Sequence, residues 1–175
     1  MLQHLVLAAM GKHSPRLIEE LTKAILDCSC SISDSRLSNL GSECTILVKI
    51  SGTWDAIAKF EDTMPKLATR LGLSMDSNRI HALKSTSGLM PYAIDAVCSD
   101  RLGVVHEIAR FMADNELQIQ DLYTNIYQAA NTATQMFSVH MTINIPADTA
   151  ISLVRNDFID FCDRLNLDAI MEPVK

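Results

Sequence analysis

Long apolar runs are missing from this sequence of 175 residues, which argues against a membrane-spanning helix. No stretch approaches the roughly 18 to 20 consecutive apolar residues that a helix needs to cross a bilayer. The opening residues, Met1 to His4, also lack the basic flank and the apolar centre of a signal peptide. We therefore expect a cytoplasmic protein with no membrane partner.

A disulfide framework and a metal centre are not indicated either. The five cysteines are odd in number, and most stand inside apolar periodic segments, so we expect reduced, buried thiols. Cys28 and Cys30 form a single C-x-C pair, and no second pair or suitably spaced histidine completes a metal set. We expect no metal and no other cofactor.

Catalytic motifs are absent as well. The sequence has no nucleophile elbow, Walker loop, zinc-protease motif or dinucleotide fingerprint. Its histidines are scattered: His4, His13, His81, His106 and His140. We expect no catalytic residues and no enzyme activity.

Positive charge is scarce in the second half of the chain. Residues 88–175 contain five Lys and Arg against twelve Asp and Glu, whereas residues 1–87 contain ten against nine. An acidic half repels phosphate backbones, which proteins bind by neutralising several phosphates with Lys and Arg. Direct nucleic-acid binding is therefore not expected.

What the sequence does contain is one pattern that occurs twice. A shift of 87 positions superposes the apolar positions of one helix and the strand after it: Leu17, Ile18, Leu21, Ala24, Ile25, Ile32 and Asp34 fall on Val104, Val105, Ile108, Phe111, Met112, Ile119 and Asp121. This period is too long for a solenoid and fits two copies of one small domain. With 48% hydrophobic residues, the chain can form two cores, and we place the domains at 1–86 and 87–175.

Each copy is expected to form a strand, a helix, two strands, a helix and a strand. The expected ranges are 3–10, 17–28, 29–40, 44–51, 52–71 and 73–83 in the first copy, then, after a linker at 84–88, 90–98, 103–115, 117–128, 135–145, 146–165 and 168–174 in the second. Ser14 is expected to cap the first helix, with Pro15 in its first turn. Trp54 is expected on the inner stripe of the second helix, and Pro65 is expected to kink or restart that helix.

This element order predicts an α+β fold of two ferredoxin-like βαββαβ domains in tandem. With right-handed crossovers, each domain has a four-stranded antiparallel sheet with two helices on one face. The other face would be bare, and apolar positions there, such as Val6, Ala8, Met10 and Val97, need cover from the other copy or from a second chain. We therefore expect a homo-oligomer.

The turn at Asp100-Arg101-Leu102-Gly103-Val104 is the candidate binding element. Gly103 would let the backbone approach a ligand closely, and the first N–H groups of the helix favour an anion such as a carboxylate. Gln118, on what we take as the neighbouring strand, could bind the amine or the carboxylate of an amino acid. A glycine after a strand is also often only the start of a helix, and Asp100 with Arg101 can equally be a structural cap.

These residues resemble the ACT domain over nearly the whole chain, twice. The resemblance rests on the βαββαβ unit, on the D-R-x-G-[IV]-V turn at 100–105, and on the strand opening at 118–121, which 31–34 matches. It implies an amino-acid site where the turn of one domain meets the strand of another. The implied ligand-binding residues are Asp100, Arg101, Leu102, Gly103, Val104, Gln118 and Ile119.

The first copy departs from this pattern. It has His13, Ser14, Pro15 and Arg16 where the second copy has the residues 100–103, so a Cβ and a long cation stand in the place of Gly103. Together with Ser31 and Ile32 these residues would form a degenerate second site. Either that site is lost, which we favour, or Arg16 supplies a charge for a carboxylate.

More narrowly, the chain is similar to the family of glycine cleavage repressors. The similarity rests on Cys28-Ser29-Cys30 running into Ile32 and 34–37, and on the helix start at 52–57. It implies a regulator that responds to glycine or another small amino acid, contacts a LysR-type transcriptional activator, and does not touch DNA. The alternative is an ACT-type regulatory subunit of an amino-acid biosynthetic enzyme, although such subunits usually have a different second half. An RNA-recognition module is disfavoured because the strand 44–51 has no aromatic residue.

Overall fold

The structure, a computed structural model, describes residues 2–80, 88–130 and 132–174. The chain divides into two compact units, Met1–Lys84 and Ser85–Lys175. The predicted boundary between residues 86 and 87 stays a prediction, because it falls among residues 81–87, outside the described ranges. His81, the end of the strand expected at 73–83, and all of the expected linker except Gly88 lie there too.

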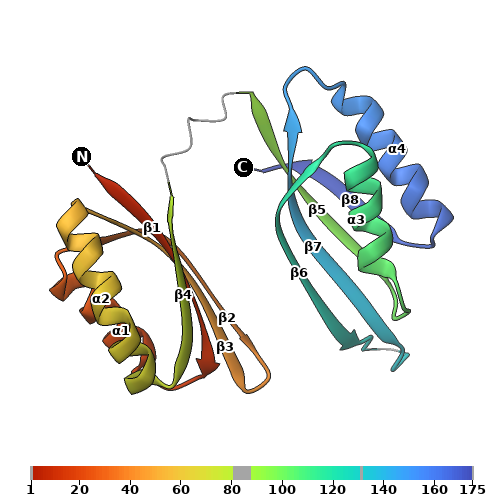
Figure 1. Cartoon of the computed structure of the whole chain (residues 1–175). Coiled ribbons are helices and arrows are strands. Elements are labelled where there is room, and N and C mark those ends of the chain that lie inside the picture. The colour runs from red at the N-terminus through yellow and green to blue at the C-terminus, as the bar shows by residue number, and fades with distance from the viewer. Residues whose placement is uncertain (1, 81–87, 131, 175) are drawn as a thin grey trace. The chain divides into compact units, whose positions relative to one another are not determined.

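The first unit has the predicted βαββαβ order. Its elements are β1 (Gln3–Lys12), α1 (Leu17–Asp27), β2 (Ser31–Leu40), β3 (Glu43–Gly52), α2 (Trp54–Leu71) and β4 (Leu73–Ile80). The strands form one antiparallel sheet in the order β2-β3-β1-β4. Both helices lie against the same face of that sheet (Figure 1).

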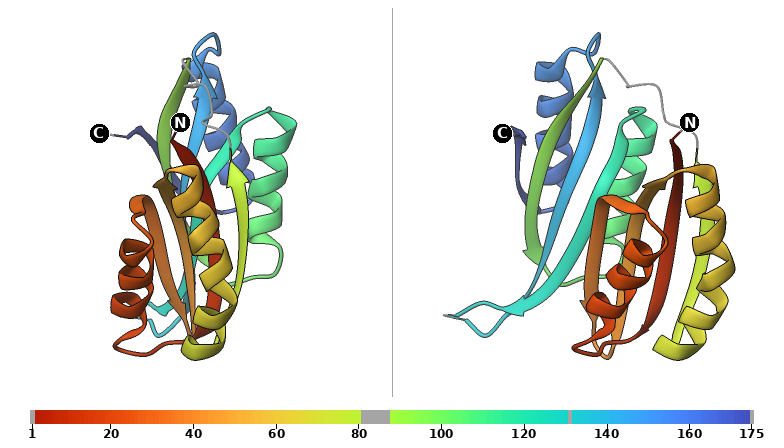
Figure 2. Two further views of the ribbon diagram at one scale, coloured as in Figure 1. Left: turned by 60° about the vertical axis from the view of Figure 1, so that its left-hand side comes forward. Right: turned by 90° about the vertical axis from the view of Figure 1, so that its left-hand side faces the viewer.

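The second unit repeats this arrangement. Its elements are β5 (Leu89–Ser99), α3 (Val104–Asp114), β6 (Gln118–Gln128), β7 (Gln135–Pro146), α4 (Ile151–Arg164) and β8 (Asp168–Pro173). The antiparallel sheet has the order β6-β7-β5-β8, and α3 and α4 cover one of its faces (Figure 2). The predicted pair of ferredoxin-like domains is thus confirmed.

Each unit has its own hydrophobic core between its sheet and its helices. In the first, Leu5 and Leu7 of β1 are fully buried and pair with Ile50 and Val48 of β3, beneath Phe60 of α2. The second core is built in the same way. Alternation along the strands and the spacing of three or four along the helices place these side chains on one face, which is why periodicity predicted the fold.

All five cysteines are free and buried, as predicted. Cys162 shows the effect of that burial most clearly, because loss of hydration raises the pKa of its thiol to about 12. The cysteines therefore act as small apolar core residues. Within the described residues, none of the helices combines the length and the apolar character needed to span a membrane.

The faces of the two sheets that lie away from the helices differ chemically. In the second unit, Asp95 of β5 pairs with His140 of β7, and the His140 ring stacks on Tyr123 of β6 at a centroid distance of 4.9 Å. In the first unit, Ala8 and Leu47 hold the register positions of Asp95 and His140. The duplicated domains have thus diverged on this face while keeping the same core.

The predicted start of α1 at Leu17 is confirmed, but its predicted N-cap and the predicted start of the last helix were wrong. Arg16, not Ser14, is the N-cap of α1, and the Ser14 carbonyl instead accepts a hydrogen bond from Leu17 N–H at 3.1 Å. The last helix begins at Ile151 rather than at Pro146, because Pro146 still pairs with Leu89 as the end of β7. In both places a turn occupies the residues between the strand and the helix.

In α2 the expected position of Trp54 was wrong and the expected restart at Pro65 does not occur, whereas the alternative of a kink there stays a prediction. The helix does not restart at Pro65, which lies inside one continuous helix on its exposed side, where water can satisfy the carbonyl that proline leaves without a donor. Trp54 is 60% exposed and packs against the Arg79 guanidinium, 5.5 Å from its ring centroid, instead of joining the inner stripe. Thr53, just before it, caps the helix by accepting a hydrogen bond from Ala56 N–H.

Candidate functional site

The candidate site in the second unit is the turn from β5 to α3. Its backbone is anchored to the sheet, since Asp100 N–H donates to the carbonyl of Gln135 at the start of β7, at 3.1 Å. Leu102 is 99% exposed, whereas Val104, two residues on, is buried. The turn therefore presents a short exposed loop held firmly at both ends.

Gly103 is the N-cap of α3 and has the left-handed conformation that the predicted turn requires. Its φ is +91°, which L-residues rarely adopt, and its carbonyl accepts from Glu107 N–H at 2.9 Å. A Cβ built on Gly103 would meet nothing within 4 Å. Glycine is thus needed here for the backbone conformation, and the space beside it is open to a ligand.

Arg101 forms an ion pair one turn into the helix, with Glu107 rather than with Asp100. Arg101 Nη2 lies 2.7 Å from Glu107 Oε2, and this hydrogen bond lowers the pKa of Glu107 and raises that of Arg101. Burial raises the pKa of the nearby Cys98 thiol, although the positive charge of Arg101 acts in the opposite direction. The guanidinium is thereby held beside the turn, with N–H groups left to bind a carboxylate.

The structure does not bring Gln118 and Ile119 to this turn within the unit. Gln118 begins β6, which pairs with β7 and not with β5, so the expectation of a neighbouring strand was wrong. Through Asn144 of β7, Gln118 lies level with Pro91, and the turn follows Ser99, eight residues further along β5. At about 3.3 Å per residue, the two parts are separated by about 26 Å along the sheet.

Gln118 itself is exposed, and Ile119 is half-buried against the second core, next to a bulge in β6. The first unit shows the same separation. Its turn follows Lys12, at one end of β1, whereas Ile32 pairs with Ile50 of β3 and so lies level with Leu5, near the other end.

The turn of the first unit differs from that of the second in its backbone. Arg16, which stands in the place of Gly103, has φ −94° and an ordinary right-handed conformation. His13, Ser14, Pro15 and Arg16 are all exposed. The Ser31 hydroxyl donates to the Ser51 carbonyl at 3.3 Å. The loss of the site in the first copy stays a prediction.

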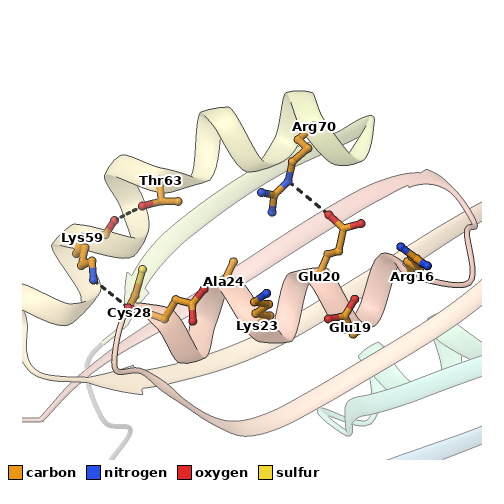
Figure 3. Close-up of a pocket in the computed structure, with 10 residues that line it drawn as sticks. Arg16, Glu19, Glu20, Lys23, Ala24, Cys28, Lys59, Thr63 and Arg70 are labelled. Atoms are coloured by element: carbon orange, nitrogen blue, oxygen red, sulfur yellow. Dashed lines mark hydrogen bonds and ion pairs between the residues drawn. The ribbon is translucent and has the colours of Figure 1, made fainter.

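A charged hollow between α1 and α2 was missed in the sequence (Figure 3). It measures about 640 Å³ and is lined by Arg16, Glu19, Glu20, Lys23, Ala24, Asp27, Cys28, Lys59, Thr63 and Arg70. Arg70 Nε lies 3.4 Å from Glu20 Oε2, and Lys59 Nζ donates to the Asp27 carbonyl at 2.9 Å. Each helix alone shows an ordinary solvated face, so only the pairing of the two helices reveals the hollow.

The described residues offer no metal centre. Among residues 2–80, 88–130 and 132–174, no three His, Cys, Asp or Glu side chains are grouped so that they could hold an ion. At the turn, Arg101 and backbone N–H groups offer hydrogen bonding and charge pairing.

Comparison with known proteins agrees with the two-domain arrangement. The ACT domain model matches residues 3–78. The chain is 30% identical, over 174 residues, to the glycine cleavage system transcriptional repressors of Escherichia coli (strain K12) and Shigella flexneri. The match spans 98% of this chain and 90% of each relative, so it includes both units.

Solved structures share the fold over the full length. A crystal structure of a protein proposed to be a glycine cleavage system transcriptional repressor superposes with a TM-score of 0.76 at 22% identity, covering 100% of this chain and 99% of the other. A protein of unknown function from Galdieria sulphuraria superposes with a TM-score of 0.81 at 17% identity, covering 100% of both chains. At these identities the likeness concerns the fold.

Proposed function

Because this chain belongs to the family of the glycine cleavage system transcriptional repressor, we propose that it is a glycine-responsive regulator of transcription. The observation that carries the proposal is the 30% identity that extends over 98% of the chain. A match of this extent includes both ACT-like units. We further propose that the protein acts in the cytoplasm and is not an enzyme.

The regulator would act on a LysR-type transcriptional activator by direct contact and would not bind DNA. The charge of the chain supports contact with a protein and not with DNA, because the second unit carries five Lys and Arg against twelve Asp and Glu. Such a unit repels phosphate and attracts basic protein surfaces. Homo-oligomers are part of the same proposal.

Glycine would bind at the turn before α3. Its carboxylate would lie at the helix N-terminus beside Gly103, within reach of Arg101, and its amine would be held by Gln118 and Ile119. Since Gln118 lies at the opposite end of the sheet, the turn and the strand start would come from different units or different copies. Binding would then favour one packing of domains over another, and the activator would respond to that packing.

Calorimetric titration with glycine tests the site. We expect G103W to abolish the heat of binding seen in the wild type, because the new ring would occupy the open space beside the turn. G41W is the matched control, since Gly41 has φ +63° and equally open space but lies in the turn between β2 and β3. Equal heats in G103W and the wild type would contradict the proposed site.

Capture from the native cell extract, with and without added glycine, tests the function. Retention of a LysR-type activator in an amount that glycine changes is the expected result. Retention of a catalytic chain of amino-acid biosynthesis would instead favour the regulatory-subunit alternative.

A further inference from the structure

The outer side of α2 carries charges of alternating sign. Asp55, Lys59, Asp62 and Lys66 follow one another at spacings of four, three and four residues, so they share one side of the helix. Together with Trp54, Ala58 and Thr63 they line a single shallow hollow of about 540 Å³. We call the set Asp55, Ala58, Lys59, Asp62, Thr63 and Lys66 the alternating stripe.

Most of these charges have no partner among the residues that the structure describes. Asp55 with Lys59, and Asp62 with Lys66, have the spacing of ion pairs within a helix, yet neither pair forms in the described part of the chain. Lys59 donates to the Asp27 carbonyl, and the carboxylates of Asp55 and Asp62 and the amine of Lys66 have no hydrogen bond there. All four side chains are exposed.

The alternating stripe is complementary to itself when it is read in the opposite direction. An antiparallel copy centred between Phe60 and Glu61 places Asp55 opposite Lys66, and Lys59 opposite Asp62. The same symmetry places Ala58 and Thr63 at the same level, but on opposite flanks of the stripe, because five residues correspond to about 140° around an α-helix. The centre of the surface is formed by Lys59 and Asp62.

We propose that the alternating stripe is a docking surface for a second copy of this chain, bound through α2 across a two-fold axis. A two-fold interface requires a surface that complements itself, and the order of charges on α2 meets that requirement. Four ion pairs would form between copies, two of each kind. The proposal concerns α2 alone and depends neither on glycine nor on a transcriptional activator.

Trp54 extends this surface at one end. It is the chain's single tryptophan and is 60% exposed, which is unusual for so large an apolar side chain. In the antiparallel arrangement it lies beside the final turns of the partner helix, near the partner's Lys66. Tryptophan in such a position commonly supplies much of the binding energy of an interface, and its ring attracts cations.

The corresponding helix of the second unit lacks this property. The exposed side of α4 carries Asp157, Asp160 and Asp163, and an antiparallel copy would place Asp157 against Asp160. Like charges in that arrangement repel. Self-docking is therefore expected of α2 and not of α4, although the two helices hold the same place in their units.

Charge reversal tests the proposal in the full-length protein. The variant D55K/D62K makes the alternating stripe wholly positive, and K59E/K66E makes it wholly negative. We expect each variant alone to associate with itself at least about tenfold more weakly than the wild type, corresponding to about 1.4 kcal/mol or more, by analytical ultracentrifugation. An equimolar mixture of the two variants should recover association, because opposite stripes then meet.

D157K/D160K on α4 is the matched control, since it makes the same change of charge on the other helix and should leave α2-mediated association intact. Unchanged association of both α2 variants, a monomeric wild type, or failure of the mixture to associate would overturn the proposal. The antiparallel direction is checked by cross-linking. D55C copies should form disulfides with K66C copies faster than with each other, and the reverse preference would also overturn it.

Discussion

Arg79 shows how one side chain can fix its surroundings. Its guanidinium donates three hydrogen bonds to Glu61: from Nε to Oε1 at 3.0 Å and to Oε2 at 3.2 Å, and from Nη2 to Oε2 at 2.5 Å. It also lies over the Trp54 ring. Hydrogen bonding to Arg79 lowers the pKa of Glu61. The three residues join the start of α2, its middle and β4.

We predict that E61Q weakens the acid sensitivity of the first unit. A carboxyl whose pKa is lower in the folded chain than in the unfolded chain stabilises the fold above its ordinary pKa of about 4.5, and this contribution is lost as the pH falls through the folded pKa. E61Q should therefore lower the free energy of unfolding by about 0.5 to 1 kcal/mol at pH 7 and change it little at pH 3. Urea unfolding followed by Trp54 fluorescence measures both values.

The control for this change is E20Q, which removes the longer and more exposed ion pair between Glu20 and Arg70. We expect a smaller loss at pH 7 from E20Q than from E61Q. If E61Q lowered stability by the same amount at both pH values, the ion pair would not be the cause.

Among the elements, α2 contains residues that stabilise the helix and one residue that destabilises it. Thr53 caps its start and Gly72 ends it in the left-handed conformation. Pro65 nevertheless stands in its interior and removes one hydrogen bond. The buried positions on either side, Phe60 and Leu67, hold the helix together across this defect through the core.

We predict that P65A stabilises the first unit. Alanine restores the N–H that can donate to the Glu61 carbonyl, and it favours the helix, so the free energy of unfolding should rise by about 1 to 2 kcal/mol. The midpoint of urea unfolding, again followed by Trp54 fluorescence, measures the change. A decrease would show that the proline is accommodated without strain and acts mainly by restricting the unfolded chain.

The elements were predictable where one buried face repeats along the chain. Alternation in β1 and β5 and the helical spacing of α1 and α3 define their inner faces, and these were placed within two residues at each end. The N-cap of α1 and the start of α4 were not, since Ser14 and Pro146 fit a helix start as well as they fit a turn or a strand end.

The candidate site was predictable only in part, for a related reason. Glycine is needed at position 103 because of the local backbone conformation, and a local conformation can be predicted from neighbouring residues in the sequence. The distance from Gly103 to Gln118 depends on the order of strands in the sheet. The exposure of Trp54 also depends on tertiary structure, because Arg79 of β4 packs against the Trp54 ring at the start of α2.

At the scale of the whole molecule, the chain contains two cores that have the same arrangement of strands and helices but are built from different side chains. Phe60 in the first unit and Phe158 in the second are both fully buried at the centre of their cores. The chain's single tryptophan belongs to the first unit. Its fluorescence therefore reports on one unit, whereas circular dichroism reports on both.

We predict that F158A destabilises the second unit and leaves the first unchanged. Truncation of a buried phenylalanine costs about 3 to 5 kcal/mol, mainly through the cavity that it leaves. In F158A the ellipticity should begin to fall at a lower urea concentration while the Trp54 transition stays in place, and in F60A the Trp54 transition itself should shift. Movement of the Trp54 transition in F158A would show instead that the two units unfold together.

The separation of turn and strand start within each sheet has a consequence for measured affinities. The level of Gln118 and the end of β5 are separated by about 26 Å along the sheet, which is far more than the length of an amino acid. A molecule that touches both the turn and the strand start must therefore join two bodies. If those bodies are separate chains, dilution alone would release the metabolite. Titrations at different protein concentrations would then give different apparent dissociation constants for the amino acid. The dependence of those constants on protein concentration would measure the affinity of the chains for one another.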